Sequence, residues 1–179
     1  MYQRGYHADP IKISAILRGT EIERLKAEGK LISDRIVLTI LLEKLLLPEY
    51  RTGVIVDGFP RTYLQAEFIK LLFDKMLYLR RKYDGTAHFA KFRRPKFHIT
   101  VLYVDEEISV QRQLHRGQSQ KEHNELVTKT GHGELIAIRD TDLNEARAKE
   151  RYQHFHEHIY QSIQSVKEKF PFHFISAEA

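Results

Sequence analysis

Cysteine and tryptophan are absent from the 179 residues, and methionine occurs only twice. Without cysteine the chain can form neither a disulfide nor a thiolate zinc site, so a metal would have to bind His, Asp or Glu. The longest apolar stretch, residues 36–47, is interrupted by Thr39, Glu43 and Lys44, and it falls short of the roughly 18 apolar residues of a membrane span. The first dozen residues contain no apolar run typical of a signal peptide. We therefore expect a soluble protein of the cytoplasm or an organelle interior, with no membrane partner and no structural zinc.

Charge is distributed unevenly along the chain. The 29 basic and 24 acidic residues give a net charge of +5, yet residues 75–96 alone contain eight basic side chains and one acid. This segment carries +7, and the rest of the chain carries −2. A block of one sign indicates a solvated face or an anionic partner. The chain as a whole, with 42% hydrophobic residues, has the composition of one ordinary globular domain.

Hydrophobic periodicity predicts alternating helices and strands. Helices are expected at residues 14–28, from Ser33 or Asp34 to Pro48, at 62–82, after Asp105 and at 144–169. Short apolar runs predict buried strands at 54–56, 97–104 and 172–176. Residues 117–138 are polar and contain two glycines, which predicts a mobile loop in which residues 135–138 can form a short strand. This alternation indicates an α/β fold with a parallel sheet.

A chemically distinctive motif follows the strand predicted at 54–56. Residues 57–62 read DGFPRT, and Gln65 lies four residues beyond the arginine. Folds of the α/β class bind ligands at the carboxyl ends of their strands. There the Arg61 guanidinium can grip a phosphate with two hydrogen bonds, Asp57 can hold the waters of Mg²⁺, and the Gln65 amide can read a base edge. Gly58 keeps the backbone tight enough for a ligand to approach closely.

This hexapeptide followed by Gln65 resembles the signature of the adenylate kinase family of nucleoside monophosphate kinases. Residues 29–32 (GKLI) resemble the family's segment that wraps the monophosphate base, and Leu17-Arg18 resembles its leucine-arginine pair. Downstream, four arginines resemble those beside the lid, in the closing arginine-aspartate motif and on the long final helix: Arg112, Arg116, Arg139 and Arg151.

The resemblance implies a P-loop-kinase-like parallel sheet flanked by helices, which transfers a phosphoryl group from ATP to AMP with Mg²⁺. It implies one domain over residues 1–179, with a monophosphate-binding segment at 11–52, a basic insertion at 75–96 and a lid at 117–138. Catalysis is assigned to Arg61, Arg112, Arg116, Arg139 and Arg151. Monophosphate binding is assigned to Arg18, Gly29, Leu31, Ile32, Gly58, Arg61 and Gln65. Asp57 is expected to contact Mg²⁺ through water.

One family motif is absent from the sequence, because Gly-x-x-x-x-Gly-Lys-Ser/Thr occurs nowhere in it. That loop cradles the ATP phosphates and follows the central strand of the family's sheet. We therefore expect the central strand to be missing between the strands that end at Asp57 and Asp105. An upstream continuation of the polypeptide, direct pairing of the flanking strands or a strand from a partner could fill the slot. The first alternative, a fragment or domain of a longer kinase, is favoured.

Two other functions stay open. The chain can be a non-catalytic module that binds a nucleotide or a protein through its acceptor half. Alternatively, the basic insertion can dock RNA or an acidic protein, with Phe89, Phe92 and Phe97 stacking on bases, although nucleic acid is not among the expected partners of a kinase. His154 and His158 share a helix face, but a solvated polar face explains them more simply than a metal site.

Overall fold

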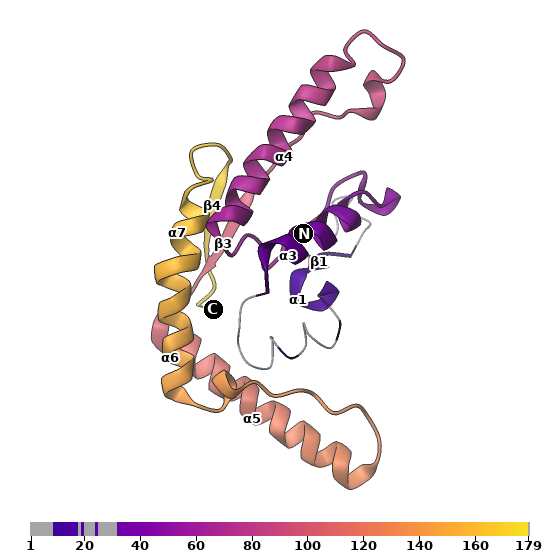
Figure 1. The fold of residues 1–179 in the computed structure, drawn as a ribbon. Coiled ribbons are helices and arrows are strands. Elements are labelled where there is room, and N and C mark those ends of the chain that lie inside the picture. The colour runs from indigo at the N-terminus through magenta and orange to yellow at the C-terminus, as the bar shows by residue number, and fades with distance from the viewer. Residues whose placement is uncertain (1–8, 18, 20–23, 25–31, 179) are drawn as a thin grey trace.

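The computed structural model describes residues 9–17, 19, 24 and 32–178 (Figure 1). Its helices are α1 (Ile13–Ile16), α3 (Asp34–Leu45), α4 (Tyr63–Lys82), α5 (Glu106–Thr130), α6 (Glu145–His154) and α7 (Tyr160–Gln164). Its strands are β1 (Ile11–Lys12), β2 (Val56–Asp57), β3 (Ile99–Tyr103) and β4 (Phe172–Ser176). Short 3₁₀ turns lie at Pro48–Tyr50, Phe89–Lys91 and Asp140–Asp142, and a π-helical turn, Phe155–Ile159, joins α6 to α7. Among these elements, no helix is both long and apolar enough to cross a bilayer.

The four strands form two separate parallel pairs. β1 pairs with β2, with Ile11 opposite Val56, and β3 pairs with β4 over five residues, beginning with Ile99 opposite Phe172. The predicted parallel α/β arrangement is confirmed. Within the described ranges β2 and β3 are not paired with each other, so the direct pairing considered above does not occur there.

Two hydrophobic cores hold these pairs in place. The first lies between β3, β4 and the helices α4 and α7, and it buries Ala66, Ile69, Val101, Ile163, Val166 and Phe170. The second joins β1, α1 and α3, and it buries Ile11, Ile13, Leu17, Val37 and Leu41. Phe59 packs against both cores. The loop that follows β2 is therefore fixed at the junction of the two.

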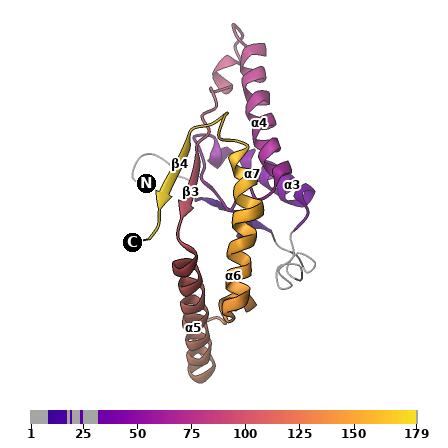
Figure 2. The same ribbon diagram turned by 90° about the vertical axis from the view of Figure 1, so that its left-hand side faces the viewer.

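Two long helices project from this body in opposite directions (Figures 1 and 2). One is α4, beside which residues 83–98 return toward β3. The other is α5, which ends at Gly131 with a φ of +68°. Residues 131–139 then return along α5, where the Asn124 amide donates to the carbonyl of Ile136 and accepts from its N–H, both at 2.7 Å.

The loop predicted at 117–138 is therefore wrong over its first half. Residues 117–130 continue α5, and the described residues 135–138 form no strand. This part of α5 lacks an apolar stripe but is rich in Gln, Glu and Lys, which have high intrinsic helix propensity. Of the helix predicted at 14–28, α1 is described, and most of the remainder lies outside the described residues.

Candidate functional site

The loop after β2 turns back on itself and holds Arg61 close to the end of the strand. Arg61 Nε donates a hydrogen bond to the carbonyl of Gly58 at 2.8 Å. Gly58 has a φ of +78°, and a Cβ added there would lie 2.6 Å from Arg61 Nη2. The position therefore requires glycine both for its backbone conformation and for the close approach of the guanidinium. Asp57, the last residue of β2, is exposed beside it.

Gln65 fixes this loop from the first turn of α4. Its Oε1 accepts from the N–H of Arg61 at 2.8 Å, and its Nε2 donates to Asp34 Oδ1 at 2.7 Å. Thr62 donates to the same carboxylate oxygen at 2.9 Å and caps α4 by accepting from the N–H of Gln65. Only 4% of Gln65 is exposed. In this structure Gln65 thus positions Arg61 and ties α3 to α4, and its base-reading role stays a prediction.

A buried carboxylate, that of Asp142, lies close to two further arginines of the site. Asp142 is 2% exposed and accepts two hydrogen bonds from Arg116, Nε to Oδ2 at 3.0 Å and Nη2 to Oδ1 at 2.6 Å. Arg151 lies 4.0 Å from the same carboxylate. The approach of α5 is close because residue 117 is glycine, where an added Cβ would lie 2.0 Å from the carbonyl oxygen of Asp142. Asp142 therefore orients Arg116 of α5 and lies close to Arg151 of α6.

The site has an excess of positive charge. Partial burial lowers the pKa of Arg151, although 46% of its side chain is exposed. The positive charges of Arg139, Arg116 and Arg61 lower it further, and the charge of Asp142 opposes them. Burial likewise lowers the pKa of Arg61, which Asp57 raises and Arg139 lowers again. Arginine remains charged at neutral pH after such shifts. The four guanidiniums therefore create a positive potential suited to an anion with several charges.

Of the five predicted catalytic arginines, Arg151 thus interacts electrostatically with Arg61, Arg116 and Arg139, and Arg61 also interacts with Arg139. The fifth, Arg112, donates to the carbonyl of Ala177 just beyond β4. Ile32 packs against the second core. Arg18, Gly29 and Leu31 lie outside the described residues. Gln113, whose Oε1 lies 3.4 Å from Arg151 Nη1, was not predicted from the sequence, because no motif distinguishes it from the other polar residues of α5.

Near Arg61, the protein itself offers Mg²⁺ one carboxylate, so waters and substrate phosphates would have to supply the other ligands. Within the described part of the chain, no group of three or more His, Asp or Glu residues could hold a metal ion. Asp57 is a single exposed carboxylate at the end of a strand. Mg²⁺ commonly keeps several waters and binds one or two carboxylates together with substrate phosphates. Asp57 therefore fits the predicted water-mediated contact rather than a metal centre built from protein ligands alone.

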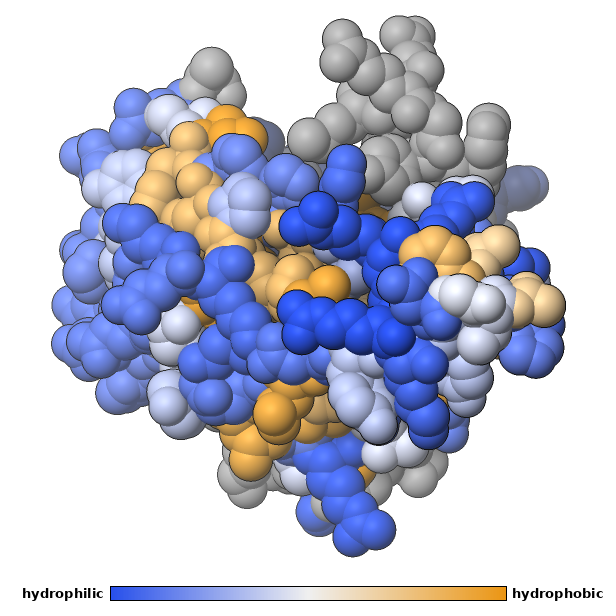
Figure 3. Space-filling model, turned by 90° about the horizontal axis from the view of Figure 1, so that it is seen from above, coloured by the Kyte–Doolittle hydropathy of each residue, from blue (hydrophilic) through white to orange (hydrophobic). Residues whose placement is uncertain are grey.

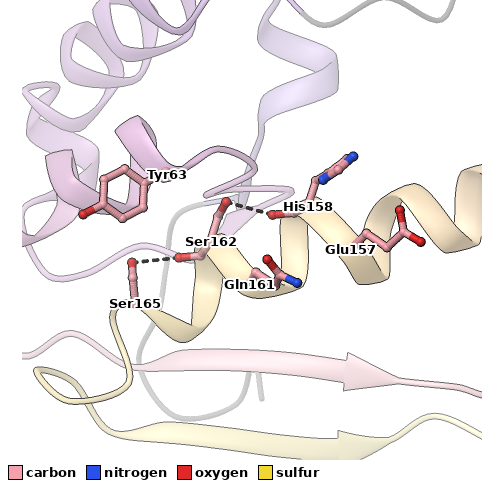
Figure 4. Close-up of a pocket in the computed structure, with 6 residues that line it drawn as sticks. All are labelled: Tyr63, Glu157, His158, Gln161, Ser162 and Ser165. Carbon is pink, nitrogen blue, oxygen red and sulfur yellow. Dashed lines mark hydrogen bonds between the residues drawn. The ribbon is translucent and has the colours of Figure 1, made fainter.

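A separate hollow lies between the start of α4 and the π-helical turn leading into α7 (Figure 4). It has a volume of about 420 Å³ and is lined by Tyr63, Glu157, His158, Gln161, Ser162 and Ser165. Its two serine hydroxyls donate to backbone carbonyls of their own helical segment, at 2.8 Å each. It contains neither an arginine nor a lysine, so it does not resemble the anion site around Arg61.

Fold and site together define an α/β protein with an arginine-rich candidate site. A scan against models of known protein families found no match. Curated relatives include the adenylate kinases of Azorhizobium caulinodans, 34% identical over 68% of this chain and 54% of that protein, and of Xanthobacter autotrophicus, 36% identical over 65% and 53%. The adenylate kinase of Rhizobium etli is 47% identical over 30% of this chain and 27% of its own length.

Over part of its length, the chain therefore matches the adenylate kinase family, which confirms the resemblance seen in residues 57–62. The match also supports the α/β kinase-like fold. The chain spans about half the length of the curated relatives that it matches most extensively.

Proposed function

We propose that this chain binds AMP and takes part in the transfer of the terminal phosphoryl group of ATP to it. The observation that carries the proposal is the convergence of Arg61, Arg116, Arg139 and Arg151 on one region with a single buried carboxylate, Asp142, between two of them. Phosphoryl transfer requires positioning and charge stabilisation rather than covalent chemistry by the protein. Clustered arginines supply both, because each is permanently charged and can bind phosphate oxygens with two hydrogen bonds.

Each arginine has a role that its surroundings support. Arg61, which is held by Gly58 and Gln65 at the end of β2, would bind the AMP phosphate. Arg116, which Asp142 orients, and Arg151, which lies close to the same carboxylate, would neutralise the charge of the transferring group. Arg139 would add positive charge between the two sets. Mg²⁺, bound with ATP, would supply further charge neutralisation at the donor phosphates, with Asp57 holding one of its waters.

The ATP side of the reaction needs a phosphate-binding loop, and the sequence contains no Gly-x-x-x-x-Gly-Lys-Ser/Thr. We propose that a strand carrying this loop fits between β2 and β3, supplied by an upstream continuation or by a partner. Support comes from the separation of the two strand pairs and from Leu102 and Ile175, neighbours in the β3–β4 register that are 65% and 45% exposed. An added parallel strand would pair with the free edges, and the helix after its loop would cover this apolar face.

An assay of ADP formation tests this proposal. The chain is incubated with ATP, AMP and Mg²⁺, both alone and fused behind a strand–phosphate-loop–helix segment, and ADP is quantified chromatographically. We expect turnover only in the fusion, and its loss in the fusion that carries Arg61→Ala.

The second candidate, a non-catalytic nucleotide-binding module, rests on the absent loop motif. Turnover by the chain alone would exclude that candidate and would also refute the requirement for an added loop. A folded fusion that binds AMP but forms no ADP would support the module and contradict the kinase.

A further inference from the structure

The basic segment 75–96 forms a defined hairpin at the end of α4. Arg80 Nη1 donates to the carbonyl of Phe92 at 2.6 Å, and its guanidinium lies 4.3 Å from the centre of the Phe89 ring. The rings of Tyr83 and Phe92 are stacked at 4.7 Å with an interplanar angle of 5°. Thr86 closes the turn by donating its hydroxyl hydrogen to the carbonyl of Tyr83 at 2.7 Å. These contacts fix the return segment against α4, so the cations occupy defined positions on a projecting surface (Figure 1).

The positive charge of this hairpin is not neutralised by the described part of the chain. None of its eight Lys and Arg side chains lies within 4.0 Å of a described carboxylate. Its one acid, Asp84, accepts from the N–H of Gly85 in the turn. Seven of the eight cations are exposed: Lys75, Arg81, Lys82, Lys91, Arg93, Arg94 and Lys96. Hydrophilic side chains cover much of the face seen from above, from which α4 projects (Figure 3).

The aromatic rings of this segment, which could stack on bases, contact other side chains of the chain. Phe89 lies beneath Arg80, Phe92 stacks on Tyr83, and Phe97 packs against Phe73 and Phe170 at the edge of the first core. These rings make intramolecular contacts, which stacking on bases would have to replace. Of the large hydrophobic side chains in residues 75–96, Tyr78 alone is exposed, at 54%. One exposed ring is fewer than the cluster of apolar anchors typical of membrane-binding segments and protein hot spots.

From these observations we propose that the hairpin of residues 75–96 binds the phosphodiester backbone of a nucleic acid duplex, independently of base sequence. Arginine and lysine contacts to phosphates provide this type of binding without base readout. The cations of α4, from Lys75 to Lys82, span about 10 Å at the rise of a helix. The same length of duplex carries about six phosphate charges. The three exposed cations of this part of α4, Lys75, Arg81 and Lys82, are fewer than these charges, so each can meet a phosphate of a duplex, whether RNA or DNA.

Fluorescence anisotropy with labelled duplexes of mixed sequence tests the proposal. If about five of the seven exposed cations contact phosphates, the logarithm of the association constant falls with the logarithm of the salt concentration with a slope of about −4.5. The affinity then falls about 500-fold between about 50 and 200 mM salt. Replacing Lys91, Arg93 and Arg94 with alanine removes three contacts, so the slope falls to about −2. Exchanging Lys and Arg at these three positions preserves the slope. A control variant, in which Lys121, Lys129 and Lys167 on other surfaces become alanine, keeps the parental affinity.

Circular dichroism melting establishes that each variant is folded before its binding is compared. Equal binding of RNA and DNA duplexes supports recognition of the shared backbone, and binding of RNA alone supports the proposal with RNA as the source of that backbone. An unchanged slope in the triple alanine variant would overturn it. Tighter binding of a single strand than of a duplex, or binding of anionic lipid vesicles without binding of either duplex, would overturn it as well. AMP binding, which depends on the separate Arg61 site, is expected to be the same in parent and variant.

Discussion

The substitution Gly117→Ala tests whether α5 packs closely against the turn that carries Asp142. In the interior of an ordinary helix this substitution stabilises by about 1 kcal/mol, because alanine has the higher helix propensity. Here the new Cβ would lie 2.0 Å from the carbonyl oxygen of Asp142 and 2.7 Å from its carbonyl carbon. Backbone atoms cannot rotate away as a side chain can, so the turn must move.

Two unfavourable contributions oppose the gain in helix propensity. Overpacking costs about 1–3 kcal/mol, and a displaced buried carboxylate that loses its partner costs about 3–5 kcal/mol more. Because Arg116 is 45% exposed, we expect only part of the second cost. The free energy of unfolding should therefore fall by about 2–4 kcal/mol, which lowers the urea midpoint by about 1–2 M.

Urea unfolding followed by circular dichroism measures this change, and Ser119→Ala, at an exposed position of the same helix, is the matched control. The control should be neutral or slightly stabilising. The variant should also bind AMP more weakly than the control, because Asp142 no longer directs Arg116. A stability gain of about 1 kcal/mol in Gly117→Ala would refute the close approach of α5 to Asp142.

Two further predictions concern Gln65 and Tyr103. Gln65→Leu should lower the free energy of unfolding by about 1–3 kcal/mol, since it leaves the N–H of Arg61 without its acceptor and removes one of the two donors to Asp34 Oδ1. Calorimetry should also show weaker AMP binding, and parental affinity would contradict the positioning role of Gln65. The hydrogen bond from Tyr103 to Asp105, together with the charge of Asp105, raises the pKa of Tyr103 to about 12. Its stabilising contribution is therefore complete below the ordinary pKa of about 10 and is lost as pH rises through about 12. The difference between the ultraviolet titrations of the parent and Tyr103→Phe isolates the titration of Tyr103, and its midpoint should lie at about 12. In Asp105→Asn the midpoint should move toward the ordinary value of about 10. A midpoint of about 10 in the parent would contradict the contact.

The sequence was most informative where local signals determine structure. Thr62 caps α4 and Lys82 ends it, as the periodicity predicts, and β4 has the predicted bounds 172–176. The prediction failed for residues 117–130, which form a helix through residue propensity without the apolar stripe that periodicity detects. The contacts of Phe89 with Arg80 and of Phe92 with Tyr83 were not predicted either, because periodicity does not report which side chains meet across a turn.

The candidate site shows the same division. Arg61 and its loop follow from a contiguous motif, so the sequence alone identified them. The role of Asp142 as a shared partner of two arginines arises only when α5 and α6 meet at the 3₁₀ turn of 140–142. No local sequence pattern predicts this contact between α5 and the turn, although Gly117 permits it because it has no side chain.

Titration calorimetry of AMP is the most direct test of the central claim that the arginine cluster binds a monophosphate. The parent is compared with Arg61→Ala and with a control, Arg35→Ala, at an exposed position of α3; CMP, UMP and adenosine serve as comparison ligands. We predict that the parent binds AMP more strongly than adenosine and that the control retains this binding. In Arg61→Ala the affinity for AMP should fall about 10- to 100-fold, because a charge-assisted hydrogen bond contributes about 1.5–3 kcal/mol. AMP binding of equal strength in parent and Arg61→Ala, or no AMP binding by the folded parent, would contradict the claim.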